Sequence, residues 1–336
     1  MRGPFKLNWR RKKRHWLAIF FYFLVWDAAG SDRPLNVPLA IANHNPFIRI
    51  YGIPYTLAPF VKGQGYDLDL QLDVSSSFTD ANTGEEFIVM DGETYRLTLR
   101  GVYGWNNGWE SGVEVPFIKH SGGFLDSFIL NWHDLFSFPQ LGRDKVANNQ
   151  LHYRYRRDGV DLVNVSDGTS GLGDIVLYAA REVPFGEQTA ARVQIKLPTG
   201  SSDKLFGSGG VDIALSLQSA FELHNNWRLF GGAGGAYLGP GEVLPSLQRH
   251  WAAFANLGLI WQAAPRVSLQ LQFAGQTSVY NDSALHQLDS GAVQTTLGGT
   301  IKLANNWYLD LGVTEDEIVF DVSPDVSFHL RLRHSN

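Results

Sequence analysis

Apolar and polar residues alternate along most of the chain. In residues 66–78, for example, the leucines at positions 68, 70 and 72 alternate with acidic and amide side chains. A period of two residues is typical of a β-strand with one apolar and one polar face. The same period predicts about twelve strands, at 66–78, 94–105, 109–119, 172–183, 190–197, 211–223, 227–238, 251–262, 267–278, 292–303, 307–314 and 326–333.

Three of the intervening turns are rich in asparagine and lead directly into a tryptophan. They are Asn106-Asn107-Gly108-Trp109, Asn225-Asn226-Trp227 and Asn305-Asn306-Trp307. Asparagine and glycine accept the positive φ of tight hairpins, and an indole beside the turn suits a lipid headgroup boundary. Short turns that alternate with longer connections predict an all-β fold, a transmembrane antiparallel β-barrel with both termini on the periplasmic side.

The aromatic residues indicate which strand face is outward. If Leu70, Leu97 and Val113 face lipid, the same parity puts a set of aromatic side chains on the lipid face near the periplasmic ends of the strands. This set forms a predicted aromatic girdle and comprises Tyr66, Trp105, Trp109, Trp227, Trp261 and Trp307.

The N-terminus has the features of an export signal. A basic run at residues 10–14 precedes an apolar run at 16–26, and small residues follow at Ala28 and Gly30. As a helix the apolar run reaches only about 16 Å, against roughly 30 Å of hydrocarbon in a bilayer. We therefore predict a signal peptide at residues 1–30, cleaved to leave Ser31 as the first residue, and location in the outer membrane of a Gram-negative cell.

Two segments fall outside the strand pattern. Residues 31–65 contain five prolines, and we interpret them as a periplasmic segment or as a plug in the lumen of a barrel formed by residues 66–336. Apolar residues between 124 and 136 recur at helical spacing, and Asp158-Gly159 suggests a hairpin turn. We expect both in one large extracellular loop, at about residues 120–171.

Composition excludes several classes of function. Residues 1–30 hold seven basic and one acidic residue, so the 21 basic and 32 acidic residues that remain give the mature chain a charge of −11. This charge argues against nucleic acid as a partner. The chain has no cysteine, so it has no disulfide or thiolate metal site, and its ten histidines show no close metal-ligand spacing. No metal site or cofactor is predicted.

Charged residues recur on the polar face of the strands, which lines the lumen. The register of the short turn sets Arg100 opposite Glu114, and Lys196 and Asp212 are comparably paired. Either such pairs only stabilise a narrow polar interior, or they create a transverse field that orients polar solutes. The predicted network comprises Asp67, Asp69, Asp73, Arg96, Arg100, Glu110, Glu114, Lys196, Asp212, Arg331 and Arg333, with His329 beside the aspartates.

Several short motifs carry a family resemblance. They are Ser121-Gly122-Gly123-Phe124-Leu125-Asp126 with Trp132-His133-Asp134, then Gly171-Leu172-Gly173-Asp174, and Lys196-Leu197-Pro198-Thr199-Gly200 with Gly207-Ser208-Gly209-Gly210-Val211-Asp212. Through them the chain resembles the proteobacterial outer-membrane proteins with domain of unknown function 3187. The last two blocks also resemble the barrel family of the phenol-degradation meta-pathway. The resemblance implies a β-barrel and no particular activity.

These observations predict a passive channel or uptake protein for small molecules. Its expected partners are outer-membrane lipid, the outer-membrane assembly machinery and a small-molecule solute. One alternative is a lipid-acting hydrolase, suggested by His120-Ser121 and His133-Asp134. Adjacent strand residues point to opposite faces, however, so His120 is poorly placed to activate Ser121. The other alternative is a structural barrel without transport.

Overall fold

The computed structural model describes residues 33–59, 63–105, 107–125, 149–185, 188–224, 226–316 and 322–336. Regular structure in these residues is almost all β-strand, with short helices only at η1 (Arg33–Asn36) and α2 (His286–Asp289). No helix in these ranges has the length and apolar character needed to cross a membrane.

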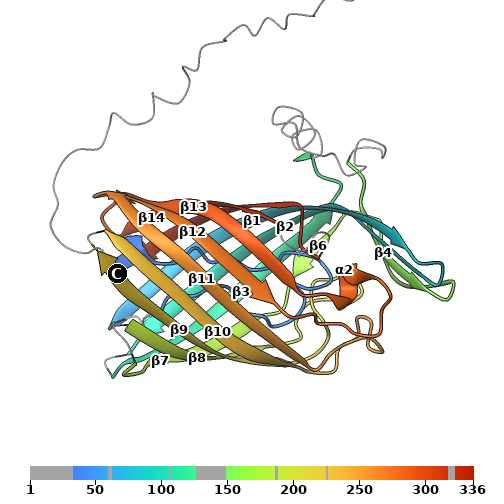
Figure 1. Ribbon diagram of the computed structural model, residues 1–336, viewed down its shortest axis with the longest axis horizontal. Coiled ribbons are helices and arrows are strands. Elements are labelled where there is room, and N and C mark those ends of the chain that lie inside the picture. The colour runs from blue at the N-terminus through green and yellow to red at the C-terminus, as the bar shows by residue number, and fades with distance from the viewer. Residues whose placement is uncertain are drawn as a thin grey trace, which may run out of the picture.

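Twelve antiparallel strands form the wall of a closed barrel (Figure 1). They are β1 (Gly65–Asn82), β2 (Glu86–Gly104), β3 (Trp109–Ser121), β7 (Val176–Glu182), β8 (Gln188–Lys196), β9 (Asp212–His224), β10 (Trp227–Leu238), β11 (Trp251–Ala264), β12 (Val267–Gln276), β13 (Ala292–Ala304), β14 (Trp307–Glu315) and β15 (Val326–Ser335).

The first and last strands pair with each other and close the sheet. Leu70 on β1 lies opposite Leu99 of β2 on one side and opposite Leu332 of β15 on the other. Closure leaves no unpaired wall edge, which is what a sheet needs in order to cross a bilayer. The predicted all-β, antiparallel, twelve-stranded transmembrane barrel is therefore confirmed.

The two rims of the barrel differ. One rim, called here the turn rim, carries the start of β1, the end of β15 and the short turns. Gly108, Asn226 and Asn306 lie in these turns and have φ values of 74°, 75° and 66°. Glycine and asparagine tolerate this left-handed conformation, which explains their recurrence before tryptophan. The opposite rim, called the loop rim, carries the longer connections.

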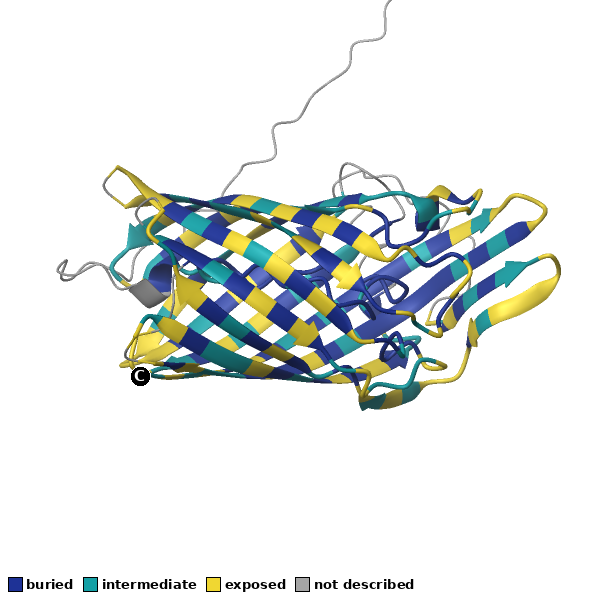
Figure 2. Ribbon diagram, turned by 90° about the horizontal axis from the view of Figure 1, so that it is seen from below, coloured by how far each residue is buried: buried dark blue, intermediate teal, exposed yellow. Residues whose placement is uncertain are grey.

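The wall alternates between exposed and buried residues along each strand (Figure 2). On β1, Leu70 is 45% exposed whereas its neighbour Asp69 is 4% exposed. Leucine, valine and aromatic side chains dominate the outer face, and charged and amide side chains dominate the inner face. This arrangement is that of a barrel with a lipid-facing exterior and a polar lumen.

The hairpin of β1 and β2 extends well past the predicted strands. The sequence predicts an end at residue 78 and a restart at residue 94, but β1 continues to Asn82 and β2 begins at Glu86. Ile88 and Met90 on this extension are buried on the same strand parity as Arg96. The lumen-facing positions thus change from polar to apolar, and the alternation that identified the strands disappears there.

Three short strands lie at the loop rim. β4 (His152–Arg157) and β5 (Val160–Val165) form a hairpin that turns at Asp158-Gly159, and β4 pairs with the extension of β2. β6 (Thr169–Leu172) pairs with the end of β3. The single strand predicted at 172–183 is therefore two strands, since the chain turns Asp174 inward between β6 and β7.

Two of the expected features lie outside the described residues. The helix expected between residues 124 and 136 falls almost entirely within the gap that separates 125 from 149, and the signal peptide falls before residue 33.

On the β4–β5 hairpin, Asp161 accepts hydrogen bonds from Arg154 and Arg156. These bonds hold the pKa of Asp161 below its usual range.

Residues 33–59, called here the inner segment, run through the interior of the barrel, seen as the blue trace in Figure 1. Beyond η1 the segment is an irregular extended chain with a turn at residues 46–50. Most of its described side chains are buried, including Leu39 and Phe47. Prolines remove backbone donors at several positions, so the segment makes no strand pairing with the wall.

Candidate functional site

The inner segment is held along β12 by a row of polar side chains. Ser268 donates to the carbonyl of Leu35 at 2.8 Å, and Gln270 donates to the carbonyl of Val37 at 2.9 Å. Gln272 donates to the carbonyl of Leu39 at 3.2 Å and accepts from its N–H at 2.7 Å. Ser268, Gln270 and Gln272 are two residues apart, so their side chains share one face of β12. The positions that they bind on the inner segment are also two residues apart, as the repeat of an extended chain allows.

A second attachment lies across the lumen, at Gly52. Its N–H donates to Oδ2 of Asp212 at 2.7 Å, and its carbonyl accepts from Gln194 at 3.3 Å. An ideal Cβ on Gly52 would lie 2.8 Å from the Cβ of Asp212 and 3.2 Å from that of Lys196. Only glycine therefore allows the inner segment to approach the wall this closely.

The wall at this point is a buried network centred on Lys196. Its Nζ lies 2.5 Å from Asp174 and 3.3 Å from Asp212, and it also donates to Ser208 and to the carbonyl of Gly210, each at 2.8 Å. The pairing of Lys196 with Asp212 matches the predicted register. Asp174, which the sequence analysis used only as part of a motif, is a further partner. Two of the sequence blocks that carry the family resemblance thus meet at one lysine.

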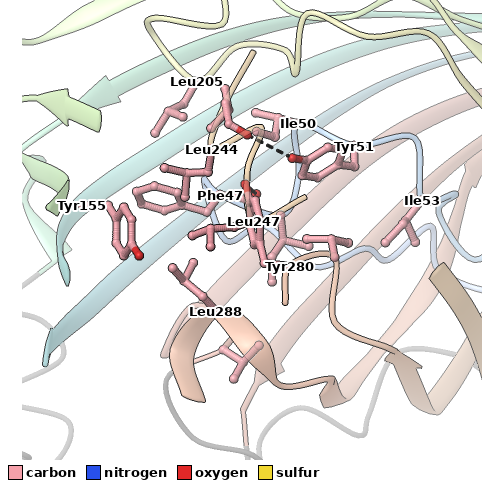
Figure 3. Close-up of a cluster of buried hydrophobic side chains, with 14 of the residues drawn as sticks. Phe47, Ile50, Tyr51, Ile53, Tyr155, Leu205, Leu244, Leu247, Tyr280 and Leu288 are labelled. Atoms are coloured by element: carbon pink, nitrogen blue, oxygen red, sulfur yellow. Dashed lines mark hydrogen bonds between the residues drawn. The ribbon is translucent and has the colours of Figure 1, made fainter. Parts of the chain in front are cut away.

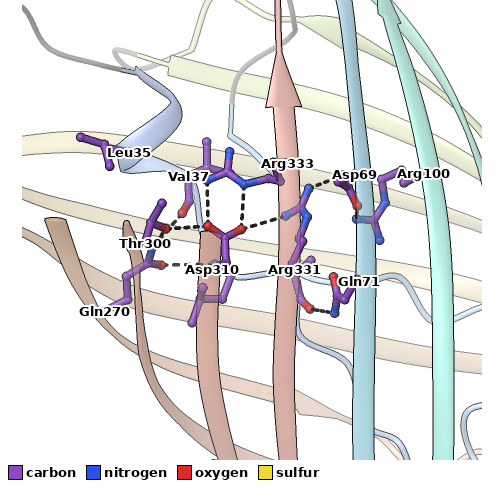
Figure 4. A network of polar contacts seen from close by, with 12 residues as sticks. Leu35, Val37, Asp69, Gln71, Arg100, Gln270, Thr300, Asp310, Arg331 and Arg333 are labelled. Atoms are coloured by element: carbon purple, nitrogen blue, oxygen red, sulfur yellow. Dashed lines mark hydrogen bonds and ion pairs between the residues drawn. The ribbon is translucent and has the colours of Figure 1, made fainter. Parts of the chain in front are cut away.

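A larger charge network crosses from β3 to β14 through the closure of the barrel, and Figure 4 shows its part from Arg100 to Asp310. Arg100 donates to Glu114 at 2.7 Å and to Asp69 at 2.9 Å. Arg331 bonds the other oxygen of Asp69 at 2.7 Å, which connects the network to β15. The alternating signs place each carboxylate beside a guanidinium, as a buried charge requires.

The network continues to Asp310, which the sequence analysis did not single out. Arg333 donates two hydrogen bonds to the carboxylate of Asp310, from Nε at 2.7 Å and from Nη2 at 2.9 Å. Thr300 donates to the same carboxylate at 2.8 Å. A two-point contact of this kind is geometrically specific as well as strong. Asp310 was missed because β14 and β15 are joined by a longer connection, which does not fix the register that brings Arg333 to it.

The remaining predicted charges are distributed around this network. Glu110 pairs with Arg192 at 3.0 Å, and Asp67 lies nearer the turn rim, only partly buried. Arg96 lies opposite Asp73 in the register of β1 and β2. Tyr55 of the inner segment lies against Arg100, whose guanidinium carbon is 5.2 Å from the ring centroid. The charged wall therefore contacts the inner segment directly.

Asp73 belongs to a separate cluster with two histidines. Its Oδ1 lies 2.7 Å from Nδ1 of His329 on β15, and its Oδ2 lies 3.6 Å from Nε2 of His44 on the inner segment. Gln71 and Tyr55 also donate to this carboxylate, at 2.7 and 3.4 Å. The three ligand-type atoms all lie within 4.8 Å of one another, a spacing that could hold a metal ion.

Toward the loop rim the lumen is filled by an apolar cluster (Figure 3). Phe47 and Tyr51 of the inner segment pack there with Leu244, Tyr280 and other side chains from the loops. Tyr280 donates to the carbonyl of Phe47 at 2.9 Å. Burial raises the pKa of Tyr280, which keeps the phenol in its protonated, hydrogen-bond-donating form.

The cavities found between the described residues of the inner segment and the wall are small. One cavity, of about 80 Å³, lies toward the turn rim beside Arg100, Arg192 and Arg331. Two others, of about 30 and 10 Å³, lie beside Tyr55 on different sides of the segment. Cavities of this size hold a few water molecules at most.

All the aromatic residues of the predicted girdle are exposed at the turn rim. Trp227 and Trp261 stack with ring centroids 5.5 Å apart, and Trp307 meets His334 edge-on at 4.9 Å. The exposed fractions range from 37% for Trp261 to 51% for Trp105. The complete set is Tyr66, Trp105, Trp109, Trp227, Trp261 and Trp307.

Among the described residues, His120 and Ser121 do not form the base and nucleophile that a hydrolase would need. His120 is buried on the lumen side, where its Nδ1 lies 2.8 Å from the hydroxyl of Thr94. Ser121 is the next residue on β3 and lies opposite Glu93 in the register with β2, whereas His120 lies opposite Thr94. His133 and Asp134 lie outside the described residues.

The fold is similar to that of known outer-membrane channels. The structure superimposes on the COG4313 outer membrane channel from Pseudomonas putida F1, with 14% identity and a TM-score of 0.53. The match covers 82% of this chain and 97% of that channel. The NanC porin matches at 8% identity over 80% of this chain and 98% of its own, with a TM-score of 0.42.

A third similar structure is the Ralstonia pickettii toluene transporter TbuX, at 9% identity over 81% of this chain and 90% of its own, with a TM-score of 0.39. A search of curated proteins found none that matches the chain. The architecture is that of an outer-membrane β-barrel, as the first of these similarities shows. The family described as "Protein of unknown function (DUF3187)" matches residues 24–335, and the chain belongs to this family, which confirms the resemblance inferred from its motifs.

Proposed function

We propose that the protein is an outer-membrane channel for small polar solutes, and that the inner segment closes it. The observation that carries this proposal is the seating of the inner segment in the lumen, with its backbone bonded to Gln272 on one side and to Asp212 on the other. A chain in this position blocks the path that a solute would take.

The inner segment can leave without opening the wall. Its contacts with the barrel are side-chain hydrogen bonds, ring contacts and apolar packing, whereas the wall is held by backbone pairing between strands. Water can replace the polar contacts at a net cost of roughly 0.5–1.5 kcal/mol for each hydrogen bond. Displacement of the segment therefore preserves every wall ladder.

The charge network indicates which solutes would pass. When the segment is displaced, the cations Arg100 and Arg333 face the lumen beside the acids Asp69 and Asp310. Adjacent strips of opposite charge produce a transverse field, which orients polar and zwitterionic molecules more than it attracts one sign of ion. We therefore expect small polar solutes, with modest ion selectivity.

Liposome swelling tests this proposal. Purified full-length protein and a variant that lacks residues 34–59 are reconstituted at equal density, and the liposomes are placed in isotonic solutions of neutral, zwitterionic and charged small solutes. We expect the variant to admit solute faster than the full-length protein. Heat-modifiable migration in gels serves as the check that both barrels are folded.

The other outcomes distinguish the alternatives. If both proteins are equally impermeable, the barrel is structural and has no transport role. If both are equally permeable, the inner segment does not close the channel. Release of fatty acid from the liposome lipid, in place of solute entry, would favour a lipid-acting hydrolase.

Export and insertion complete the proposal. Residues 1–30 serve as a signal peptide that is cleaved before Ser31, and the barrel termini face the periplasm, where the turn rim would lie. The assembly machinery would receive the exported chain and insert it into the outer membrane. Mass spectrometry of the N-terminus of the mature protein checks the cleavage position.

A further inference from the structure

We propose that His44, Asp73 and His329 form a binding site for a divalent transition-metal ion, which joins the inner segment to the wall. The proposal concerns a site and not the transport path, so its binding test does not depend on channel activity. Its consequence for closure does rest on the proposed function. These three residues are far apart in the chain, so the sequence shows no close metal-ligand spacing.

The strongest observation is an unused imidazole nitrogen. His44 is 1% exposed, and its Nε2 has no hydrogen-bond partner among the described residues, although it points toward the carboxylate of Asp73 at 3.6 Å. A buried polar atom without a partner is costly. A metal ion between His44 and Asp73 would satisfy this nitrogen.

Small side-chain adjustments would bring the three residues to metal-ligand spacing, since their ligand atoms all lie within 4.8 Å of one another and the two distances to Asp73 involve its two different oxygens. Zinc binds imidazole nitrogen and carboxylate oxygen at about 2.0–2.2 Å, and tetrahedral ligands at that radius are about 3.3–3.6 Å apart. The His44 to Asp73 separation of 3.6 Å already falls close to this spacing. His329 and Asp73, at 2.7 Å, must separate slightly, since they are now hydrogen-bonded directly.

The second nitrogen of His329 already has the partner that a metal ligand needs. Its Nε2 lies 2.8 Å from the hydroxyl of Thr314, which in turn lies 2.6 Å from the hydroxyl of Thr296. If a metal binds Nδ1, the ring proton resides on Nε2 and is donated to Thr314, and any second proton is released to solvent. Such outer contacts orient the ring and fix its tautomer.

The position of His44 is set by its neighbours in the sequence. Asn43 and Asn45 each donate from the side-chain amide to the carbonyl of Val322, at 3.3 and 3.1 Å. These bonds fasten the chain on both sides of His44 to the connection between β14 and β15. The imidazole therefore reaches the metal site from a backbone that is already held in place.

The donor set selects the class of metal. Two neutral imidazoles and one carboxylate suit zinc, nickel or copper, whereas calcium and magnesium prefer a set composed of oxygen ligands. We therefore expect Zn²⁺ to bind and Ca²⁺ not to bind.

A bound ion would connect three parts of the chain. His44 is on the inner segment, whereas Asp73 and His329 face each other across the pair of strands that closes the barrel. An ion that binds only this arrangement stabilises it by mass action. The metal would therefore hold the inner segment in the lumen.

Equilibrium dialysis of Zn²⁺ against untagged, full-length protein in detergent tests the proposal. Metal is first removed with a chelator, and the Co²⁺ absorption spectrum then reports the coordination geometry. We expect one ion per chain. His44→Gln should weaken binding by more than the roughly 10- to 100-fold typical of changes in outer contacts, and Thr314→Val should fall within that range.

Matched variants separate metal binding from an effect on folding. His120→Gln removes another buried histidine of the lumen that lies outside the cluster, and it should bind Zn²⁺ as wild type does. His44→Cys replaces one zinc ligand by another and should retain binding that His44→Gln loses. Equal affinity in wild type and His44→Gln, or no stoichiometric binding by wild type, would overturn the proposal.

Discussion

The N–H of Gly52 donates a hydrogen bond of 2.7 Å to Oδ2 of Asp212, so the inner segment shares a carboxylate with the wall. That same oxygen lies 3.3 Å from Nζ of Lys196. One buried acid therefore balances a wall cation and also anchors the backbone inside the lumen. A change in the charge of Asp212 or Lys196 would therefore also affect how the inner segment is attached to the wall.

We expect Gly52→Ala to loosen the inner segment. The new Cβ would lie 2.8 Å from the Cβ of Asp212, and overpacking of this kind costs about 1–3 kcal/mol. The population with a displaced segment should rise by about 5- to 150-fold. The measurement is the rate of tryptic cleavage after Arg49, followed by mass spectrometry. Gly63→Ala, where nothing lies within 4 Å of the added Cβ, is the control, and equal cleavage in both variants would contradict the prediction.

Gln272→Leu should weaken the attachment along β12. The substitution removes the nearer acceptor of the Leu39 N–H, which keeps only the longer contact of 3.2 Å with Gln270. It also removes the donor to the Leu39 carbonyl, and a buried group left without a partner costs about 1–3 kcal/mol. Exchange of the Leu39 amide hydrogen should accelerate. Gln294→Leu is the matched control, because Gln294 is also buried in the barrel but its Nε2 has no hydrogen-bond partner in the described part of the chain. Similar exchange rates in the two variants would show that the row of glutamines does not hold the segment.

Arg100→Gln should destabilise the barrel itself. It removes the direct ion pair with Glu114 and one of the two direct ion pairs of Asp69, and loss of one partner of a buried pair costs about 3–5 kcal/mol. Urea unfolding in detergent micelles measures the loss. The double variant Arg100→Gln/Glu114→Gln should recover part of it. Arg181→Gln, at an exposed position near Trp109, should cost less than about 1 kcal/mol, and a similar cost at both arginines would argue against the network.

Leu70→Arg tests which face of the wall meets lipid. An arginine on the lipid face near the bilayer midplane costs about 2–4 kcal/mol. Leu162 is the control, because it is exposed to a similar degree, 47% against 45%, but lies on the β4–β5 hairpin beyond the loop rim. We expect Leu70→Arg to reduce the folded fraction in lipid vesicles and Leu162→Arg to leave it unchanged. The opposite ranking would mean that the apolar face does not contact lipid.

The wall was predictable from the sequence because each of its strands has one apolar and one polar face. The prediction failed where that condition ends. On the extension of β2, Ile88 and Met90 face the interior as apolar residues, so both faces are apolar and no alternation remains. At Asp174 the chain leaves the strand for the Lys196 network, which divides one predicted strand into two.

The charge pairs were predictable where the register between two strands could be inferred from the sequence. Arg100 and Glu114 are joined by a tight turn, and their pairing follows from it. The closure of β15 against β1 places His329 opposite Asp73, as expected, whereas the contact of Asp310 with Arg333 depends on the register of β14 and β15, which their longer connection does not fix. The role of Gln270 and Gln272 requires the inner segment to be in the lumen, and the sequence left open whether it lies there or in the periplasm.

Single-channel conductance in planar bilayers tests the central claim most directly. Full-length protein is compared with the variant that lacks residues 34–59, at the same voltage and salt concentration. If the inner segment closes the lumen, the variant should show stable open channels with a conductance well above that of the full-length protein. Equal conductance in the two proteins, with both barrels folded and inserted, would contradict the claim.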